Sequence, residues 1–168
     1  MSDAAPFVVT LGLDAELQER LERARQQFFP EHRNIVPAHV SLFHHLPGSA
    51  EQDVLATLRS VCAVTAPFTV AITGILGLGR GTAYRVAASG VLHGRLADAW
   101  RPMLTRQDSQ PWRPHVTIQN KVDPGEARAL QTQLSAGFTP FEGRAEAVLL
   151  WRYVGGPWSP AGVFRLTA

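Results

Sequence analysis

The sequence is poor in cysteine, because Cys62 is the single thiol in 168 residues. An internal disulfide and a cysteine-based zinc cluster are therefore excluded. The chain also lacks any run of 18 or more apolar residues, which a membrane-spanning helix requires. Its first residues, MSDAAPF, do not show the basic stretch and apolar run of a secretory signal. We expect a soluble, cytoplasmic protein without a membrane partner.

The chain also lacks a large excess of charge of either sign. Sixteen basic and fourteen acidic side chains leave a formal net charge of +2, which is too small for a protein that coats nucleic acid. Lys121 is the one lysine; all other basic side chains are arginines. Hydrophobic residues make up 45% and charged residues 18% of the chain, a balance that excludes disorder and favours a packed core. The length fits one domain over residues 1–168.

Short apolar runs alternate with segments of helical spacing. Asp14 and Asp123 stand where helix caps are expected, and Pro124 suits the first turn of a helix. The patterns predict strands at 7–13, 37–43, 68–76, 82–88, 113–121, 145–154 and 163–166. They predict helices at 15–29, from 49 onward, at 91–104 and at 124–134.

The order of these elements indicates an α+β fold with antiparallel sheets. Two strand pairs have no crossover helix between them, and the glycines around Arg80 favour a hairpin turn. The strand segment that contains His39 is echoed 76 residues later by one that contains His115. This repeat predicts two pseudo-symmetric lobes that bring the two histidine strands together.

The two histidine segments share one pattern: histidine, apolar residue, hydroxyl residue, apolar residue. The first is His39-Val40-Ser41-Leu42 and the second is His115-Val116-Thr117-Ile118. Because alternate side chains of a strand share a face, each histidine should lie beside its hydroxyl, and the apolar residues should be buried. By composition the full pattern would occur about 0.14 times by chance, so a double occurrence is a strong signal.

The paired motifs resemble the signature of the 2H phosphoesterase superfamily, which includes RNA 2',3'-cyclic phosphodiesterases once called 2'-5' RNA ligases. The resemblance covers most of the chain, and the stretch from Pro114 to Lys121 looks especially like the second motif of a bacterial branch. It implies a bilobal α+β fold: two antiparallel β-sheet lobes with outer helices, a central cleft and no metal or other cofactor. Members with RNA phosphodiesterase activity commonly carry an arginine after the second motif, where this chain has Asn120 and Lys121. The substrate therefore stays open between an RNA end, a cyclic nucleotide and an ADP-ribose cyclic phosphate.

The chemistry of a cyclic phosphate fits these side chains. Hydrolysis needs a base for water, an acid for the departing ribose oxygen and donors for the phosphoryl oxygens. Histidine serves as acid or base near neutral pH, so His39 and His115 are the predicted catalytic pair. Ser41, Thr117 and Lys121 are the predicted phosphate donors. The resemblance implies that His39 is the acid and His115 the base; the chemistry alone does not order them.

Further residues are weaker candidates. Phe43, Arg80, Tyr84 and Trp112 are predicted at the substrate rim, where an aromatic ring could stack on a base. His44 and His45 follow the first motif and would share a metal site with His39, but no acidic ligand stands at suitable spacing nearby.

The function predicted from these features is hydrolysis of a 2',3'-cyclic phosphate on RNA or a nucleotide, without metal and without an obligate protein partner. Two alternatives remain: a non-catalytic module that binds RNA or nucleotide, and a 2'-5' RNA ligase that runs the same chemistry in reverse.

Overall fold

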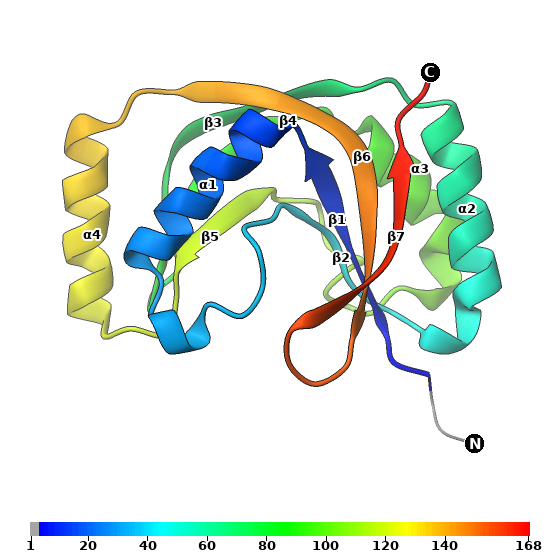
Figure 1. Ribbon diagram of the computed structural model, residues 1–168, viewed down its shortest axis with the longest axis horizontal. Coiled ribbons are helices and arrows are strands. Elements are labelled where there is room, and N and C mark those ends of the chain that lie inside the picture. The colour runs from blue at the N-terminus through cyan, green and yellow to red at the C-terminus, as the bar shows by residue number, and fades with distance from the viewer. Residues whose placement is uncertain (1–3) are drawn as a thin grey trace.

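The computed structural model describes residues 4–168, which form one seven-stranded antiparallel sheet and four α-helices (Figure 1). None of the helices in this part of the chain is long and apolar enough to cross a membrane. The elements are β1 (Phe7–Leu13), α1 (Ala15–Phe28), β2 (Ser41–Leu46), α2 (Glu51–Ala63), β3 (Phe68–Gly77), β4 (Thr82–Ala88), α3 (Val91–Trp100), β5 (His115–Gln119), α4 (Pro124–Gly137), β6 (Phe141–Tyr153) and β7 (Trp158–Arg165).

Local sequence signals explain where two helices begin. The carboxylate of Asp14 accepts a hydrogen bond from the Leu17 backbone N–H at 2.9 Å, which satisfies one of the free donors in the first turn of α1. Asp123 does the same for Gly125 at the start of α4, where Pro124 occupies the first turn. Both predicted caps are confirmed. The sequence misplaces the start of α2, because a 3₁₀ turn over Gly48–Ala50 precedes it and Ser49 caps nothing.

Strand β6 joins two halves of the sheet. Its first residues pair with β3, and its later residues pair with β1 on one side and β7 on the other. The strand order is β2-β1-β6-β3-β4-β5, with β7 attached to β6. The sheet curls along β6, which arches over the molecule in Figure 1. Strand β2, which begins within the first motif, and strand β5, which carries the second, therefore lie at opposite ends of the strand order.

The order strand-helix-strand-helix-strand occurs twice, as β1-α1-β2-α2-β3 and as β4-α3-β5-α4-β6. In each copy the last strand pairs with the other copy: β3 pairs with β4, and β6 pairs with β1. Helices cross over as well, since α1 packs on β5 and α3 packs on α2. Figure 1 shows α1 and α4 on the side of β3, β4 and β5, with α2 and α3 on the side of β1, β2 and β7.

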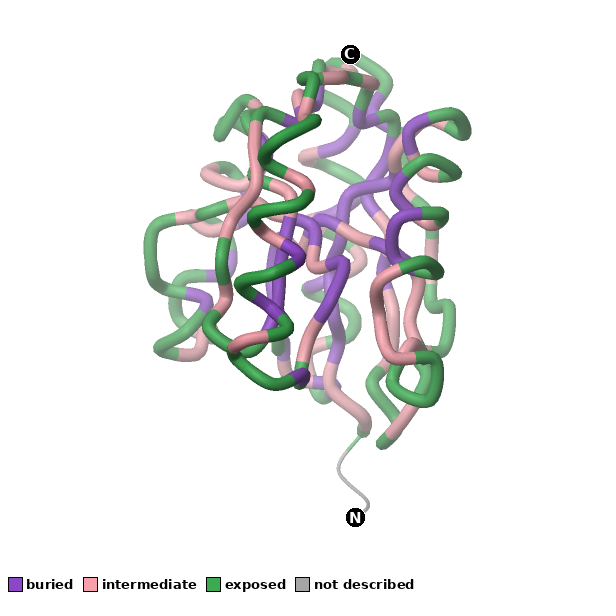
Figure 2. Tube along the Cα trace, turned by 90° about the vertical axis from the view of Figure 1, so that its left-hand side faces the viewer, coloured by how far each residue is buried: buried purple, intermediate pink, exposed green. Residues whose placement is uncertain are grey.

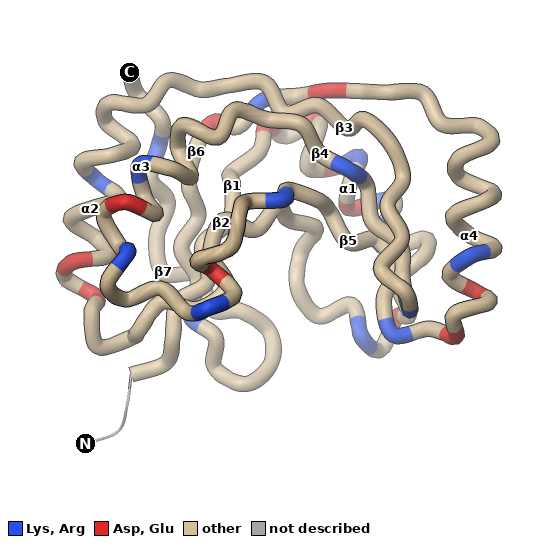
Figure 3. Tube along the Cα trace, turned by 180° about the vertical axis from the view of Figure 1, so that it is seen from behind, with Lys and Arg blue, Asp and Glu red and all other residues tan. Residues whose placement is uncertain are grey.

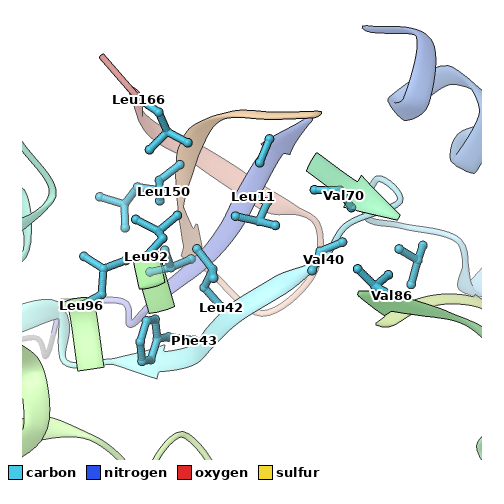
Figure 4. Close-up of a cluster of buried hydrophobic side chains, with 14 of the residues drawn as sticks. Leu11, Val40, Leu42, Phe43, Val70, Val86, Leu92, Leu96, Leu150 and Leu166 are labelled. Atoms are coloured by element: carbon cyan, nitrogen blue, oxygen red, sulfur yellow. The ribbon is translucent and has the colours of Figure 1, made fainter. Parts of the chain in front are cut away.

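A continuous core of buried side chains connects the two halves. Leu42 and Phe43 of β2 pack near Leu92 and Leu96 of α3, as Figure 4 shows. Buried segments run through the centre of the tube in Figure 2, while the outer helical turns are exposed. The predicted α+β fold with antiparallel strands is confirmed.

Several predicted boundaries differ from the structure. Strand β2 begins at Ser41 instead of residue 37, and β5 spans only His115–Gln119. Strand β6 begins earlier than predicted, because its first residues pair with β3. Strand β7 begins earlier than predicted, because its first residues pair with the end of β6. Helix α3 ends at Trp100, where a 3₁₀ turn with Pro102 takes over.

Candidate active site

The two motif histidines are held in the same way. The Nδ1 atom of His39 lies 2.8 Å from the carbonyl oxygen of Pro37, and Nδ1 of His115 lies 2.9 Å from the carbonyl oxygen of Arg113. A carbonyl oxygen only accepts, so in both rings Nδ1 carries the hydrogen. In the neutral ring this leaves the Nε2 lone pair free, and a proton added to the ring is carried there. Each Nε2 can therefore give or take a proton.

Burial alternates along both motifs as the sequence predicts. Val40 and Leu42 are buried in the first motif, and Val116 and Ile118 are buried in the second. The histidines and hydroxyl residues between them are only partly buried. The apolar residues thus anchor each segment in the core, and the polar ones stay accessible.

Helix α1 holds both motif segments through one polar face. Gln18 Nε2 donates to the Ala38 carbonyl at 2.8 Å, and the Ala38 N–H donates to a Glu22 oxygen at 2.7 Å. These side chains satisfy the backbone groups that a strand partner would otherwise satisfy, which explains why β2 begins after His39. One turn further, Arg25 Nη1 donates to the Thr117 carbonyl at 2.9 Å. The spacing of four and three residues places all three contacts on one side of the helix.

Arg25 is the most buried charge near the motifs, with 3% of its surface exposed. Its Nε atom donates to Asn34 at 2.7 Å, and its guanidinium lies 4.0 Å from the centre of the Phe29 ring. Arg25 was not among the residues predicted from the sequence. Its position three residues after Glu22, on the polar side of the predicted helix, was the only available signal.

Ser41 and His115 line one cavity of about 150 Å³, although they are 74 positions apart in the chain. We call it the small cavity; Leu42, His44, His93, Gln107, Asp108, Gln110, Pro111, Trp112 and Arg113 complete its lining. The indole Nε1 of Trp112 donates to the Ser41 carbonyl at 2.9 Å and so ties the segment before β5 to β2. The structure therefore brings one residue of each motif to a shared space.

His39 lines a second and larger cavity of about 540 Å³, together with Thr10, Gln18 and Trp151. The ring of Trp158 lies against His39, with 4.6 Å between ring centres. Trp158 therefore packs directly on the motif histidine. His39 and Ser41 are two positions apart in the sequence, so residues of the same motif line both cavities.

The environment of His39 favours its neutral form. Burial lowers the pKa of His39 to about 4, an effect that the hydrogen bond to Pro37 opposes only in part. The positive charge of Arg25 lowers this pKa further, as does a proton on the imidazole of His44 or His115. A phosphate between the histidines would meet several positive or proton-donating groups.

A bulge in β2 changes which side chains follow Ser41 on the accessible face. In the pairing with β1, Thr10 opposes Ser41 while Val9 opposes Phe43, so one residue of β1 matches two of β2. Phe43 consequently points inward and is 0% exposed, stacked on His93 with 4.8 Å between ring centres. The prediction of Phe43 at the substrate rim is wrong for this reason.

Because of the bulge, His44 and not His45 lies on the face of Ser41. His44 lines the small cavity, and its Nδ1 lies 3.0 Å from a carboxylate oxygen of Asp108. His45 lines a different cavity, beside Pro47 and Pro6. Among residues 4–168, no group of three histidine, cysteine or acidic side chains could hold a metal ion.

The remaining predicted residues are scattered. Lys121 lies beyond the end of β5, in a left-handed backbone conformation with φ of 58°, and lines a pocket with Phe29 and Ile35 instead of either motif cavity. Arg80, in the turn between β3 and β4, donates to the carbonyl of Val122, which follows β5. Strand β5 ends at Gln119, so strand alternation does not carry the side chain of Lys121, a predicted phosphate donor, to the motif face.

Tyr84 packs against Phe138 and Phe141, on the side of β4 that faces the core. Its neighbour Arg85 pairs directly with His115 in the β4–β5 register. Directly opposed residues of antiparallel strands share a face, so Arg85 is the better placed of the two at the motif. Figure 3 shows basic positions on β4 and near the start of β5.

The comparisons with known proteins agree with this architecture. The chain matches the 2'-5' RNA ligase superfamily over residues 13–157. No curated protein sequence matches significantly.

Solved structures share the fold. TT0787 of Thermus thermophilus superposes with a TM-score of 0.69 at 18% identity, over 97% of this chain and 98% of that one. E. coli LigT complexed with 3'-AMP gives 0.64 at 15% identity, over 98% and 99%. Usb1 of Kluyveromyces marxianus with uridine monophosphate gives 0.51 at 16% identity, over 95% and 99%. The family match over most of the chain and the shared fold lead to one conclusion: the chain belongs to the 2'-5' RNA ligase superfamily of 2H phosphoesterases.

Proposed function

We propose that the protein is a metal-independent phosphodiesterase that opens a 2',3'-cyclic phosphate on an RNA end or a nucleotide, with His39 and His115 as the acid and base. The observation that carries this proposal is the matched geometry of the two rings. Each donates Nδ1–H to the carbonyl two residues earlier, so each keeps Nε2 for proton transfer. Paired imidazoles of this kind are suited to a displacement that needs a proton removed at one end and delivered at the other.

The steps follow from these roles. One imidazole removes a proton from water, and the resulting hydroxide attacks phosphorus. The bond from phosphorus to one ribose oxygen breaks, and the second imidazole gives that oxygen a proton. The product is a phosphomonoester beside a free hydroxyl. Ser41 and Thr117 are proposed to donate hydrogen bonds to the phosphoryl oxygens, where negative charge grows in the transition state.

The acid role that the resemblance implies for His39 requires a protonated ring. Burial lowers the pKa of His39 to about 4, so the ring is neutral in the free protein at pH 7. An anionic phosphate beside the ring favours the imidazolium and raises that pKa. Substrate binding would therefore bring a proton to His39.

The test is turnover of 2',3'-cyclic AMP and of a short RNA with a cyclic phosphate end. The wild-type protein should release a phosphomonoester, and His39→Ala and His115→Ala should each lower kcat at least ~100-fold. His32→Ala is the matched control, since His32 lies exposed in the short turn after α1. Binding without turnover would favour the non-catalytic module, and joining of RNA ends without hydrolysis would favour the ligase.

A further inference from the structure

His44 is the third imidazole near the motifs, and it has no part in the proposed mechanism. The bulge in β2 turns its side chain into the small cavity that Ser41 and His115 also line. Bulges of this kind redirect a side chain at the cost of one ladder position. His45, the next residue, faces a separate pocket, so the placement is specific to His44.

A buried carboxylate orients the His44 ring. Asp108 Oδ1 lies 3.0 Å from His44 Nδ1, and the Asp108 side chain is 1% exposed whereas the His44 side chain is 47% exposed. The same carboxylate accepts hydrogen bonds of 2.9 Å from the backbone N–H groups of His44 and His45. Burial by itself raises the pKa of Asp108, but these hydrogen bonds outweigh it and hold the pKa below its usual value.

An ionised Asp108 fixes the orientation of its partner. It accepts the hydrogen of Nδ1, which leaves Nε2 as the atom that can reach a ligand. In the protonated form of this half-exposed ring, Nε2–H is a suitable donor to an anionic oxygen.

The position along β2 decides which anionic oxygen this is. Ser41 and His44 are three residues apart, which spans ~10 Å in an extended strand and somewhat less across a bulge. Because side chains of a strand stand roughly perpendicular to it, this separation suits two successive phosphates of one ligand better than one phosphate shared by both residues. Arg113 lines the same cavity and adds positive charge there.

We propose that His44, oriented by Asp108, binds a second phosphate of the substrate, next to the one between His39 and His115. This inference rests on the proposed function for the location of the reacting phosphate. It defines the substrate class as a cyclic phosphate attached to another phosphate, either through an RNA phosphodiester or through the pyrophosphate of a dinucleotide. Asp108 is a positioning residue in this arrangement.

The first experiment measures binding and does not depend on turnover. Adenosine 3'-monophosphate carries one phosphate, and adenosine 3',5'-bisphosphate carries two. The wild-type protein should bind the bisphosphate about tenfold more tightly, the lower range for a hydrogen bond to a charged group at a half-exposed position. His44→Gln should abolish this preference, and His45→Gln, the matched control, should keep it. An equal affinity for both ligands in the wild-type protein, or a preference that survives His44→Gln, would overturn the proposal.

Kinetics separate the two sources of the second phosphate and isolate the role of Asp108. The two substrates with a second phosphate are a dinucleotide with a cyclic phosphate end and ADP-ribose cyclic phosphate. His44→Gln should raise KM about tenfold for whichever of them places its second phosphate at His44, and should change KM for 2',3'-cyclic AMP less than twofold. An equal loss on all three substrates would overturn the inference. Asp108→Asn should raise KM for the same ligand. Thermal unfolding of the variant shows whether the fold is retained. An unchanged KM in a folded Asp108→Asn variant would refute the positioning role of Asp108. If the wild-type protein turns over none of them, the proposed function fails while the binding comparison still decides the role of His44.

Discussion

Acid should destabilise this protein through His39. The folded chain holds the pKa of His39 at about 4, whereas an unfolded chain restores the ordinary value of 6.5. Above pH 6.5 the ring is neutral in both states and contributes no pH dependence. Between pH 6.5 and about 4 the unfolded chain binds a proton that the folded chain does not, so the free energy of unfolding falls as the pH falls.

The size of this effect follows from the same two values. At about 1.36 kcal/mol for each pH unit, the difference corresponds to about 3 kcal/mol of stability lost between pH 6.5 and pH 4. Against a typical free energy of unfolding of about 5–15 kcal/mol this loss is large. The carboxylates of Asp14 and Asp108 also have lowered pKa values, but their contribution is lost at more acidic pH, below the ordinary value of 3.8.

The assay compares urea denaturation of the wild-type protein and His39→Asn at pH 7, 6, 5 and 4.5. Asparagine keeps a donor for the Pro37 carbonyl but does not titrate. The wild-type protein should lose more stability than the variant, by about 2–3 kcal/mol over this range, and subtraction of the two curves removes the contributions of all other groups. His32→Asn, at an exposed position, is the matched control and should follow the wild-type curve. Parallel curves for the wild-type protein and His39→Asn would refute the argument.

Three further outcomes are expected. Arg25→Met removes the hydrogen bonds to Thr117 and Asn34 but also relieves the cost of burying a charge, so urea denaturation should show a net loss of stability of about 2 kcal/mol. A histidine titration followed by NMR should show a higher pKa for His39, because a positive charge is removed. No change in either measurement would contradict the bridging role of Arg25. Ser41→Ala and Thr117→Ala should each lower kcat by about tenfold, less than loss of a motif histidine, and a larger loss than that would assign them a part in proton transfer. Turnover of 2',3'-cyclic AMP should persist in EDTA, and loss of activity that a divalent ion restores would show metal dependence.

Much of the architecture is encoded in local sequence. Asp14 and Asp123 cap helices because their carboxylates meet free N–H groups within three residues, and that geometry depends only on neighbouring positions. The alternation of buried and accessible residues in both motifs follows from strand geometry, which has a period of two. The superfamily resemblance, which rests on these two short motifs, is confirmed by the match over residues 13–157.

The catalytic roles of His39, His115, Ser41 and Thr117 remain predictions that turnover assays must test. What the structure adds is their surroundings. Local sequence does not reveal that Trp158 covers His39, because these residues are 119 positions apart and meet only when β7 pairs with β6.

The sequence by itself determined the repeated motifs, the alternating strands, the capped helices and the α+β class, because each depends on residues a few positions apart. The tertiary structure decided the side-chain placements that these local patterns do not specify. The mismatch between β1 and β2 made the bulge that buries Phe43 and exposes His44, and no property of β2 alone requires it. Helix α1 packs against β5, and this packing brings Arg25 to the Thr117 carbonyl. Burial of the apolar face of the helix fixes where the helix packs, and its polar side chains are placed as a result.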